Sequence, residues 1–222
     1  MDGISVAIGA MLFVCGGLVP VGSGAPSDVS VVEKTVVESP YGKDTRQVRP
    51  ATALSKTDFS DTLVIGDSVV SGAVDAVRAA LPGVTVDADP GRTFETGGAV
   101  SGYDESDGMI ESARRNAGRY ARYVIECGIN DAGLTDDMVA QFAEALGPNC
   151  QICLVNQFVT NNVDSTEQTD SVMRKACRER GWLLADWRLV ADESMLLDNC
   201  HLNDTGAARF AETIRLALVS AI

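Results

Sequence analysis

The chain has few basic residues: its 222 residues include 18 lysines and arginines against 31 aspartates and glutamates, which gives a net charge of −13 at pH 7. Proteins that bind nucleic acid neutralise phosphates with a basic surface, and this composition provides none. Nucleic acid is therefore not an expected partner. General disorder is also excluded, because 45% of the residues are apolar and only 22% are charged, enough apolar material to offset the entropy of ordering the chain.

Motifs for common cofactors are also missing. Neither a P-loop nor a dinucleotide-binding Gly-x-Gly-x-x-Gly follows the first expected strand, so nucleotide-binding functions lose support. Cys150 and Cys153 form a Cys-x-x-Cys pair without a second such pair, and this pair begins an expected strand rather than a helix. Zinc and redox chemistry are disfavoured by both facts, and we interpret these cysteines as structural. We therefore expect no cofactor and no metal.

Charge is almost absent from residues 1–27, where Asp2 is the only charged side chain. Residues from Ile4 to Gly22 are apolar or small over about the length that spans a bilayer as a helix. A basic n-region is missing, so a retained transmembrane helix is favoured over a cleaved signal segment. A buried soluble helix is disfavoured by the glycines and the proline of this stretch.

Cysteine is present at positions 15, 127, 150, 153, 177 and 200. Five of these follow the membrane segment, and an odd number cannot pair completely within the domain. If the domain is exported, we expect one or two disulfides, first between Cys150 or Cys153 and Cys177, although sequence does not fix the connectivity.

Residues 28–60 mix glycine, serine, proline and both charges without periodicity, which is typical of a linker. From residue 61 to 222, short apolar runs alternate with stretches of helical length, which predicts βα units around a parallel sheet. This fold class is α/β, a flavodoxin-like three-layer sandwich whose functional residues follow the strands. The expected strands are 62–66, 84–88, 122–127, 152–157 and 182–186, and the expected helices are 69–81, 107–120, 136–146, 166–180 and 204–219.

Ser68 follows the first expected strand in Gly66-Asp67-Ser68, at a sharp turn into a helix. There its hydroxyl would face the cleft, and its backbone N–H would stabilise a developing oxyanion at the helix N-terminus. Taken alone, serine and aspartate at such a turn are more often helix caps.

Two further strand ends carry candidate oxyanion donors. Asn130 follows the third strand in Gly128-Ile129-Asn130-Asp131, where its side-chain amide can point at the same cleft. Gly91 follows the second strand and allows close approach of the backbone to a bound group. Each motif alone also fits an ordinary turn or loop.

His201, the only histidine of the chain, lies three residues after Asp198. Histidine is the usual general base near neutral pH, and an aspartate on the same loop can accept the Nδ1 proton and leave Nε2 for a serine. A single histidine is more often structural, but its combination with Ser68 and Asp198 favours catalysis.

Taken together, these motifs resemble the blocks of the SGNH (GDSL) hydrolase family: Gly66-Asp67-Ser68, Gly91, Gly128-x-Asn130-Asp131 and Asp198-x-x-His201. The resemblance covers residues 61 to about 220. It implies that Ser68 is the nucleophile, that His201 is the base and that Asp198 orients it. It also implies that the Gly91 N–H and the Asn130 amide are oxyanion donors.

A closer resemblance is to the extracytoplasmic SGNH domains that accompany membrane acyltransferase-3 domains in peptidoglycan and cell-surface O-acetyltransferases. It rests on Val64 to Val69, on Val86-Asp87-Ala88 leading to Gly91-Arg92, on Val124 to Gly128 and on Asp186-Trp187. It implies acyl transfer to, or ester hydrolysis on, a cell-envelope glycan by an extracytoplasmic domain that is membrane-anchored or secreted. The chain lacks the multi-helix acyltransferase-3 domain, so the acyl source is open between a small acyl ester and a membrane acyltransferase partner.

Three alternatives stay open. Plain ester hydrolysis uses the same acyl-enzyme and differs only in whether water attacks it. A non-catalytic glycan-binding module is disfavoured by the complete set of candidate catalytic residues. A metal site built from Cys127, Cys200 and His201 would need a fourth ligand or water.

Overall fold

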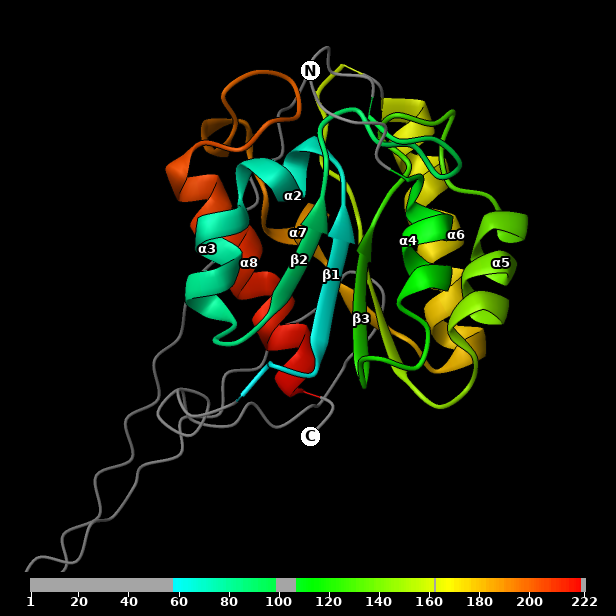
Figure 1. The fold of residues 1–222 in the computed structure, drawn as a ribbon. Helices are drawn as coiled ribbons and strands as arrows, with labels where there is room; N and C mark the ends of the chain where they lie inside the picture. Colours follow the sequence, from blue (N-terminus) through cyan, green and yellow to red (C-terminus); the bar gives the residue numbers. More distant parts are fainter. Residues whose placement is uncertain (1–57, 99–106, 162, 221–222) are drawn as a thin grey trace, which may run out of the picture. The chain divides into compact units, whose positions relative to one another are not determined.

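The described part of the chain folds around a five-stranded parallel sheet in the order β2-β1-β3-β4-β5 (Figure 1). In the computed structural model, residues 58–98, 107–161 and 163–220 are described. The predicted α/β three-layer architecture is confirmed. The strands are β1 (Thr62–Gly66), β2 (Thr85–Ala88), β3 (Arg122–Glu126), β4 (Gln151–Val155) and β5 (Leu183–Ala185).

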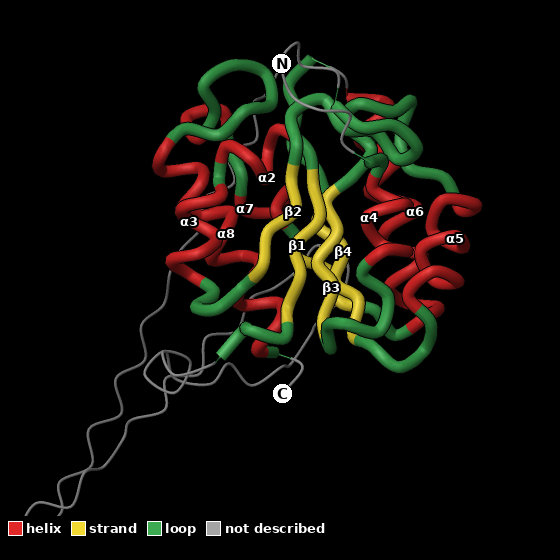
Figure 2. The backbone as a smooth tube through the Cα atoms, viewed as in Figure 1, coloured by secondary structure: helices red, strands yellow, loops and turns green. Residues whose placement is uncertain are grey.

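Helices cover both faces of this sheet, as Figure 2 shows. One layer contains α2 (Ser68–Gly72), α3 (Val74–Ala80), α7 (Trp187–Val190) and α8 (Asp204–Val219), and the other contains α4 (Met109–Arg115), α5 (Asp136–Leu146) and α6 (Val163–Arg180). Alternate strand residues point to opposite faces, so Val64 and Val124 pack in one core while Ile65 and Ile125 pack in the other. Strands buried on both faces explain the continuous apolar runs in the sequence.

Three predicted helices differ from the structure, and the smallest difference is that α6 begins at Val163 rather than at residue 166. The helix expected over 69–81 is two helices separated at Ala73, one residue after Gly72, whose lack of a side chain disfavours a continuous helix. The helix expected over 107–120 spans only Met109–Arg115. Its C-cap is Asn116, whose side-chain amide donates to the Ser112 carbonyl at 2.9 Å and so competes with the backbone. The last segments missed are α7 and the short 3-10 helix Glu193–Met195, which are too brief to show periodicity.

The prediction of a disulfide involving Cys177 is wrong, because the five described cysteines are free thiols. Cys153 packs in the core on the α8 side of the sheet, whereas Cys150 and Cys177 pack against the other core. The thiol of Cys177 instead donates to the Leu183 carbonyl at 3.2 Å.

The predicted membrane segment, residues 1–27, lies outside the described residues, as does the predicted linker up to residue 57. Among the described residues, no helix has the length and apolar character needed to cross a membrane. Phe59 is buried in the α8-side core, and the Arg122 guanidinium lies 4.9 Å from the centre of its ring. Phe59, near the start of the described residues, is therefore part of the domain core.

Candidate active site

The turn after β1 brings Ser68 to the carboxyl edge of the sheet. Asp67 caps α2, because its Oδ1 accepts the Val69 N–H at 2.9 Å, and Ser68 is the first residue of that helix. Only glycine fits at position 66, since a Cβ there would lie 2.3 Å from Val70 Cγ2. The tight passage from strand to helix therefore fixes the direction of the Ser68 side chain.

The loop before α8 brings His201 to Ser68. Its Nε2 lies 3.0 Å from Ser68 Oγ, although the two residues are 133 positions apart. Its Nδ1 lies 2.8 Å from Asp198 Oδ2. If Nδ1 carries the proton, Nε2 is free to accept one from the serine hydroxyl. The structure thus arranges Ser68, His201 and Asp198 in a single hydrogen-bonded chain with the geometry of a catalytic triad.

Asp198 is held by its own loop. Its Oδ1 accepts the backbone N–H groups of Cys200 and His201, each at 2.8 Å. These two bonds, followed by the His201 side chain, hold the pKa of Asp198 well below its usual range. The carboxylate therefore stays ionised wherever the histidine can act as a base.

Asn130 lies beside the nucleophile turn, as predicted, but both hydrogens of its amide have partners. Nδ2 is 3.1 Å from Asp67 Oδ2 and 3.1 Å from the Arg92 carbonyl oxygen. Asn130 thus connects the β1 turn to the loop after β2. To donate to an oxyanion, the Asn130 amide would have to share one of its hydrogens between two acceptors, or give up its hydrogen bond to Asp67 or to the Arg92 carbonyl.

Gly91 lies in that loop, exposed and with φ +76°, a conformation that favours glycine. The N–H of the next residue, Arg92, donates to the Asp89 carbonyl at 3.2 Å and closes the turn. The loop adjoins β1 through β2. The role of the Gly91 N–H as an oxyanion donor stays a prediction.

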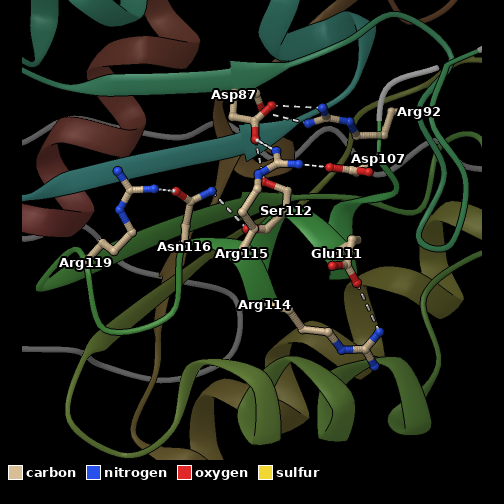
Figure 3. Close-up of polar contacts among 9 residues, drawn as sticks. All are labelled: Asp87, Arg92, Asp107, Glu111, Ser112, Arg114, Arg115, Asn116 and Arg119. Atoms are coloured by element: carbon tan, nitrogen blue, oxygen red, sulfur yellow. Dashed lines mark hydrogen bonds and ion pairs between the residues drawn. The ribbon is translucent and has the colours of Figure 1, made fainter. Parts of the chain in front are cut away.

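An ion pair between a buried arginine and a half-buried aspartate holds the same loop (Figure 3). The Arg92 guanidinium, 3% exposed, donates to Asp87 Oδ1 at 2.8 Å and to the Asp87 carbonyl at 2.9 Å. Asp87 Oδ2 accepts the Ser112 hydroxyl at 2.5 Å and Arg115 at 3.3 Å, both from α4. This cluster fixes the Arg92 carbonyl that Asn130 contacts, and sequence analysis missed it because its members come from separate elements.

A pair of buried carboxyl groups lies behind Ser68. Glu126, the last residue of β3, is 1% exposed, and Asp67 is fully buried. The Asp67 N–H approaches Glu126 Oε2 at 3.5 Å. Sequence analysis did not single out Glu126, although the sequence contained a signal for it. A charged residue directly follows the buried run Tyr123 to Ile125 within the expected strand.

Among the described residues, one group of three potential metal ligands lies together: Asp198, Cys200 and His201, whose ligand atoms are within 4.8 Å of one another. Cys127 is not in this group, so the metal site considered from Cys127, Cys200 and His201 is wrong. Cys127 is buried in the α4-side core. The hydrogen bond between Asp198 and His201 accounts for the closeness of these two side chains without a metal.

No protein-family model matches the chain, and no curated protein matches it. Among solved structures, a similar one is the C-terminal catalytic domain of peptidoglycan O-acetyltransferase A from Streptococcus pneumoniae. It has a TM-score of 0.60 and 25% identity, over 72% of this chain and 93% of that one.

Two further structures support the fold. A member of the lipolytic G-D-S-L family from Veillonella parvula has a TM-score of 0.53 and 13% identity over 68% of this chain and 94% of that one. A carbohydrate acetylesterase family member from Sinorhizobium meliloti has a TM-score of 0.54 and 13% identity, over 71% and 96%. The same fold thus occurs in a peptidoglycan O-acetyltransferase domain, in a lipolytic G-D-S-L protein and in a carbohydrate acetylesterase family member.

Proposed function

We propose that this chain transfers an acyl group to a cell-envelope glycan through an acyl-enzyme on Ser68. The chain is a member of the SGNH hydrolase family and an enzyme of the esterase or acetyltransferase type. The observation that carries the proposal is the hydrogen-bonded chain from Asp198 through His201 to Ser68. The similarity to a peptidoglycan O-acetyltransferase domain supports the choice of acceptor.

In the first half of the reaction, Ser68 Oγ attacks the carbonyl carbon of an acyl ester while His201 Nε2 takes the hydroxyl proton. Asp198 holds the ring with its proton on Nδ1 and stabilises the imidazolium that forms. As the tetrahedral intermediate collapses, the bond to the donor alcohol breaks and His201 returns the proton to that leaving group. An ester on Ser68 remains.

During this step, negative charge develops on the former carbonyl oxygen. The Ser68 N–H lies at the start of α2, where backbone N–H groups have no partner within the helix. We propose that this N–H, the Asn130 amide and the Gly91 N–H stabilise the oxyanion. Donors that are already fixed in place need little reorganisation as the charge forms.

In the second half, a sugar hydroxyl gives its proton to His201 and attacks the acyl carbon, which releases Ser68 with its proton restored. Water can take the same path, so the outcome depends on which hydroxyl lies at the acyl carbon. A bound sugar gains effective concentration over water through orientation. The net charge of −13 disfavours strongly anionic polymers, so we expect neutral or weakly charged glycan stretches.

We also propose that the domain works outside the cytoplasm, tethered or released through residues 1–27. The uncharged apolar run in that segment supports this placement. A glycan acceptor in the envelope would then lie beside the site, and acyl groups would come from a small ester or from a membrane acyltransferase partner.

The test begins with intact-mass detection of an acyl group on the protein after mixing with an acetyl ester donor. Wild-type protein should gain one acetyl group, and Ser68→Ala should gain none. Peptidoglycan-like oligosaccharides are then added, and mass spectrometry measures O-acetylated sugar against free acetate. Free acetate as the only product over a broad panel of glycans would replace the transferase by a plain esterase, whereas failure of wild-type protein to acylate would overturn the enzyme mechanism itself.

A further inference from the structure

Glu126 is a buried titratable group that the proposed mechanism does not use. It ends β3, the neighbour of β1 in the sheet, and its Oε2 lies 3.5 Å from the backbone nitrogen of Asp67. Asp67 is the residue immediately before the nucleophile. A glutamate that is 1% exposed carries a large desolvation cost when charged, so its presence at this position calls for a physical explanation.

The neighbouring Asp67 carboxylate and burial together favour the protonated form of Glu126. Burial and the charge of Asp67 raise the pKa of Glu126 well above its usual value. Asp67 is the better place for the negative charge, because its oxygens accept the Val69 N–H at 2.9 Å and the Asn130 amide at 3.1 Å. Because two adjacent buried carboxyl groups cannot both ionise easily, we expect one proton to remain on the pair, with Glu126 as the neutral acid and Asp67 as the carboxylate.

The hydrogen bonds of Asp67 leave room for a third donor. An ionised carboxylate offers about four acceptor positions, and the backbone of α2 and the side chain of Asn130 occupy one each. Glu126 Oε1 has no hydrogen-bond partner, whereas Oε2 faces the Asp67 backbone. In the neutral acid, the hydroxyl is the one group of Glu126 that can donate to Asp67.

We propose that Glu126 is a positioning residue of the active site: as a neutral acid, it donates a hydrogen bond to the Asp67 carboxylate and thereby fixes both the Ser68 turn and the Asn130 amide. Asp67 links these two parts through its separate oxygens. Glu126 does not touch the reacting atoms and acts only through Asp67. The inference rests on the proposed function of Ser68 and Asn130.

Loss of the Glu126 proton should disturb this arrangement at high pH. It would put a second negative charge against Asp67 in a buried site, where like charges repel strongly. The surrounding ionisable groups do not compensate: Asp131 is also acidic, His201 acts in its neutral form as the general base, and the two nearby thiols, Cys127 and Cys200, add no positive charge. We therefore expect turnover to fall at alkaline pH as Glu126 loses its proton.

Two substitutions separate the hydrogen bond from mere packing. Glu126→Gln keeps the size of the side chain and a donor but cannot ionise, so kcat should stay within about threefold of wild type and the alkaline fall should disappear. Glu126→Leu removes the donor, so kcat should drop about ten- to a hundredfold, the usual size for a lost hydrogen bond to a charged group. KM should change little in both variants, because Glu126 makes no contact with substrate.

A matched control is Thr62→Val, at the opposite end of β1 from the site. Thr62 is fully buried and its hydroxyl donates to Asp61 at 3.3 Å, so its loss also removes a buried polar group from the sheet. Thermal unfolding should register this change, whereas kcat and its pH profile should not. A similar loss of kcat in Thr62→Val and Glu126→Leu would reduce Glu126 to a structural residue.

A double-mutant cycle tests whether Glu126 acts through Asn130. In an Asn130→Ala background, Glu126→Leu should cost much less than it does alone, because the amide that it helps to fix is gone. Fully additive losses would overturn the proposal, as would an alkaline fall that persists in Glu126→Gln.

The protonation of Glu126 can be measured without turnover. The infrared carbonyl band of a neutral carboxylic acid should be present in wild-type protein at neutral pH and absent in Glu126→Gln. Labelling of Ser68 by a fluorophosphonate, compared between wild type and Glu126→Leu, reports whether the nucleophile turn has changed. If wild-type protein shows the band but no acyl transfer, the proposed function fails and the neutral acid stands; if it transfers acyl groups without the band, the reverse holds.

Discussion

The two sides of the active site are built in opposite ways. On the base side, the Asp198 and His201 side chains are 52% and 44% exposed, and Asp198 is held by the N–H groups of residues two and three positions further on. On the nucleophile side, Asp67 and Glu126 are almost completely buried. Their contacts join residues 59 and 63 positions apart.

This contrast separates local from tertiary control of the site. The base loop takes its shape from its own sequence, and water surrounds its charges and weakens their interactions. The nucleophile turn depends on the packing of β1 against β3 and on a loop from β2. We therefore expect changes on the buried side to affect stability and geometry, and changes at Asp198 to be compensated in part by water.

The largest expected effect tests the link between the two sides. Ser68→Ala and His201→Ala should each lower kcat by about a millionfold, and the double variant should lose no more than either single one, because triad residues act as a unit. Initial rates on a small acetyl ester measure this, with circular dichroism as the control for folding. Retention of more than about a tenth of the activity in either variant would remove that residue from the mechanism.

Removal of the Asn130 amide should have the next largest effect. We expect Asn130→Ala to reduce kcat by about a hundred- to a thousandfold, the usual loss for one oxyanion donor. Pre-steady-state acylation rates measure the chemical step directly. Asn130→Asp, of nearly the same size, should be at least as poor, since it replaces the donor by a group that repels both the oxyanion and Asp67. Unchanged acylation in Asn130→Ala would show that its two hydrogen bonds are only structural.

Asp198→Asn sharpens the comparison from the base side. In a buried triad, the same change lowers kcat by about ten thousandfold because the histidine is held in the wrong tautomer. Asp198 is half exposed, so water can accept the Nδ1 proton and the loss should be closer to a hundredfold. The pH profile of kcat/KM on a small ester is the measurement. A loss as large as that of a buried aspartate would contradict the proposed role of solvent.

The same division explains which features the sequence predicts. The apolar runs of β1 and β3 and the motifs at their ends are continuous in the chain, so the five strands followed from pattern. Ser68, Asn130 and His201 were identified by combining local motifs with their resemblance to the blocks of the family. The partnership of Glu126 with Asp67, and that of Arg92 with Asp87, needs strand order and register, which no local pattern provides. The break at Ala73 was missed for another reason: the apolar spacing continues across it while the backbone does not.

The smallest expected effect is on the pH dependence of stability in acid. Asp87 and Asp198 can be compared for it, because the pKa of each is lowered in the folded protein. Burial alone would raise the pKa of Asp87, but the hydrogen bonds from Ser112 and Arg92 and the charges of Arg92 and Arg115 more than offset this and lower it. The pKa of Asp198 is lowered by local hydrogen bonds in an exposed loop. For a carboxyl group with a lowered pKa in the folded state, the stabilisation is present above the unfolded pKa and is lost as the pH falls through the folded pKa.

Chemical denaturation between pH 7 and pH 2 therefore distinguishes the two carboxyl groups. The free energy of unfolding of wild-type protein should fall below about pH 4, and Asp87→Asn should flatten that fall because the proton that Asp87 takes up no longer matters. Asp87→Asn should also be the less stable variant at pH 7, since Arg92 is 3% exposed and loses the charge that pairs with its buried guanidinium. Asp198→Asn should follow the wild-type curve closely, because solvent screens an exposed pair. If both substitutions flattened the pH dependence of the free energy of unfolding equally, Asp198 in its exposed loop would contribute as much to acid stability as the Asp87–Arg92 pair. The contrast between the exposed and the buried sides would then fail.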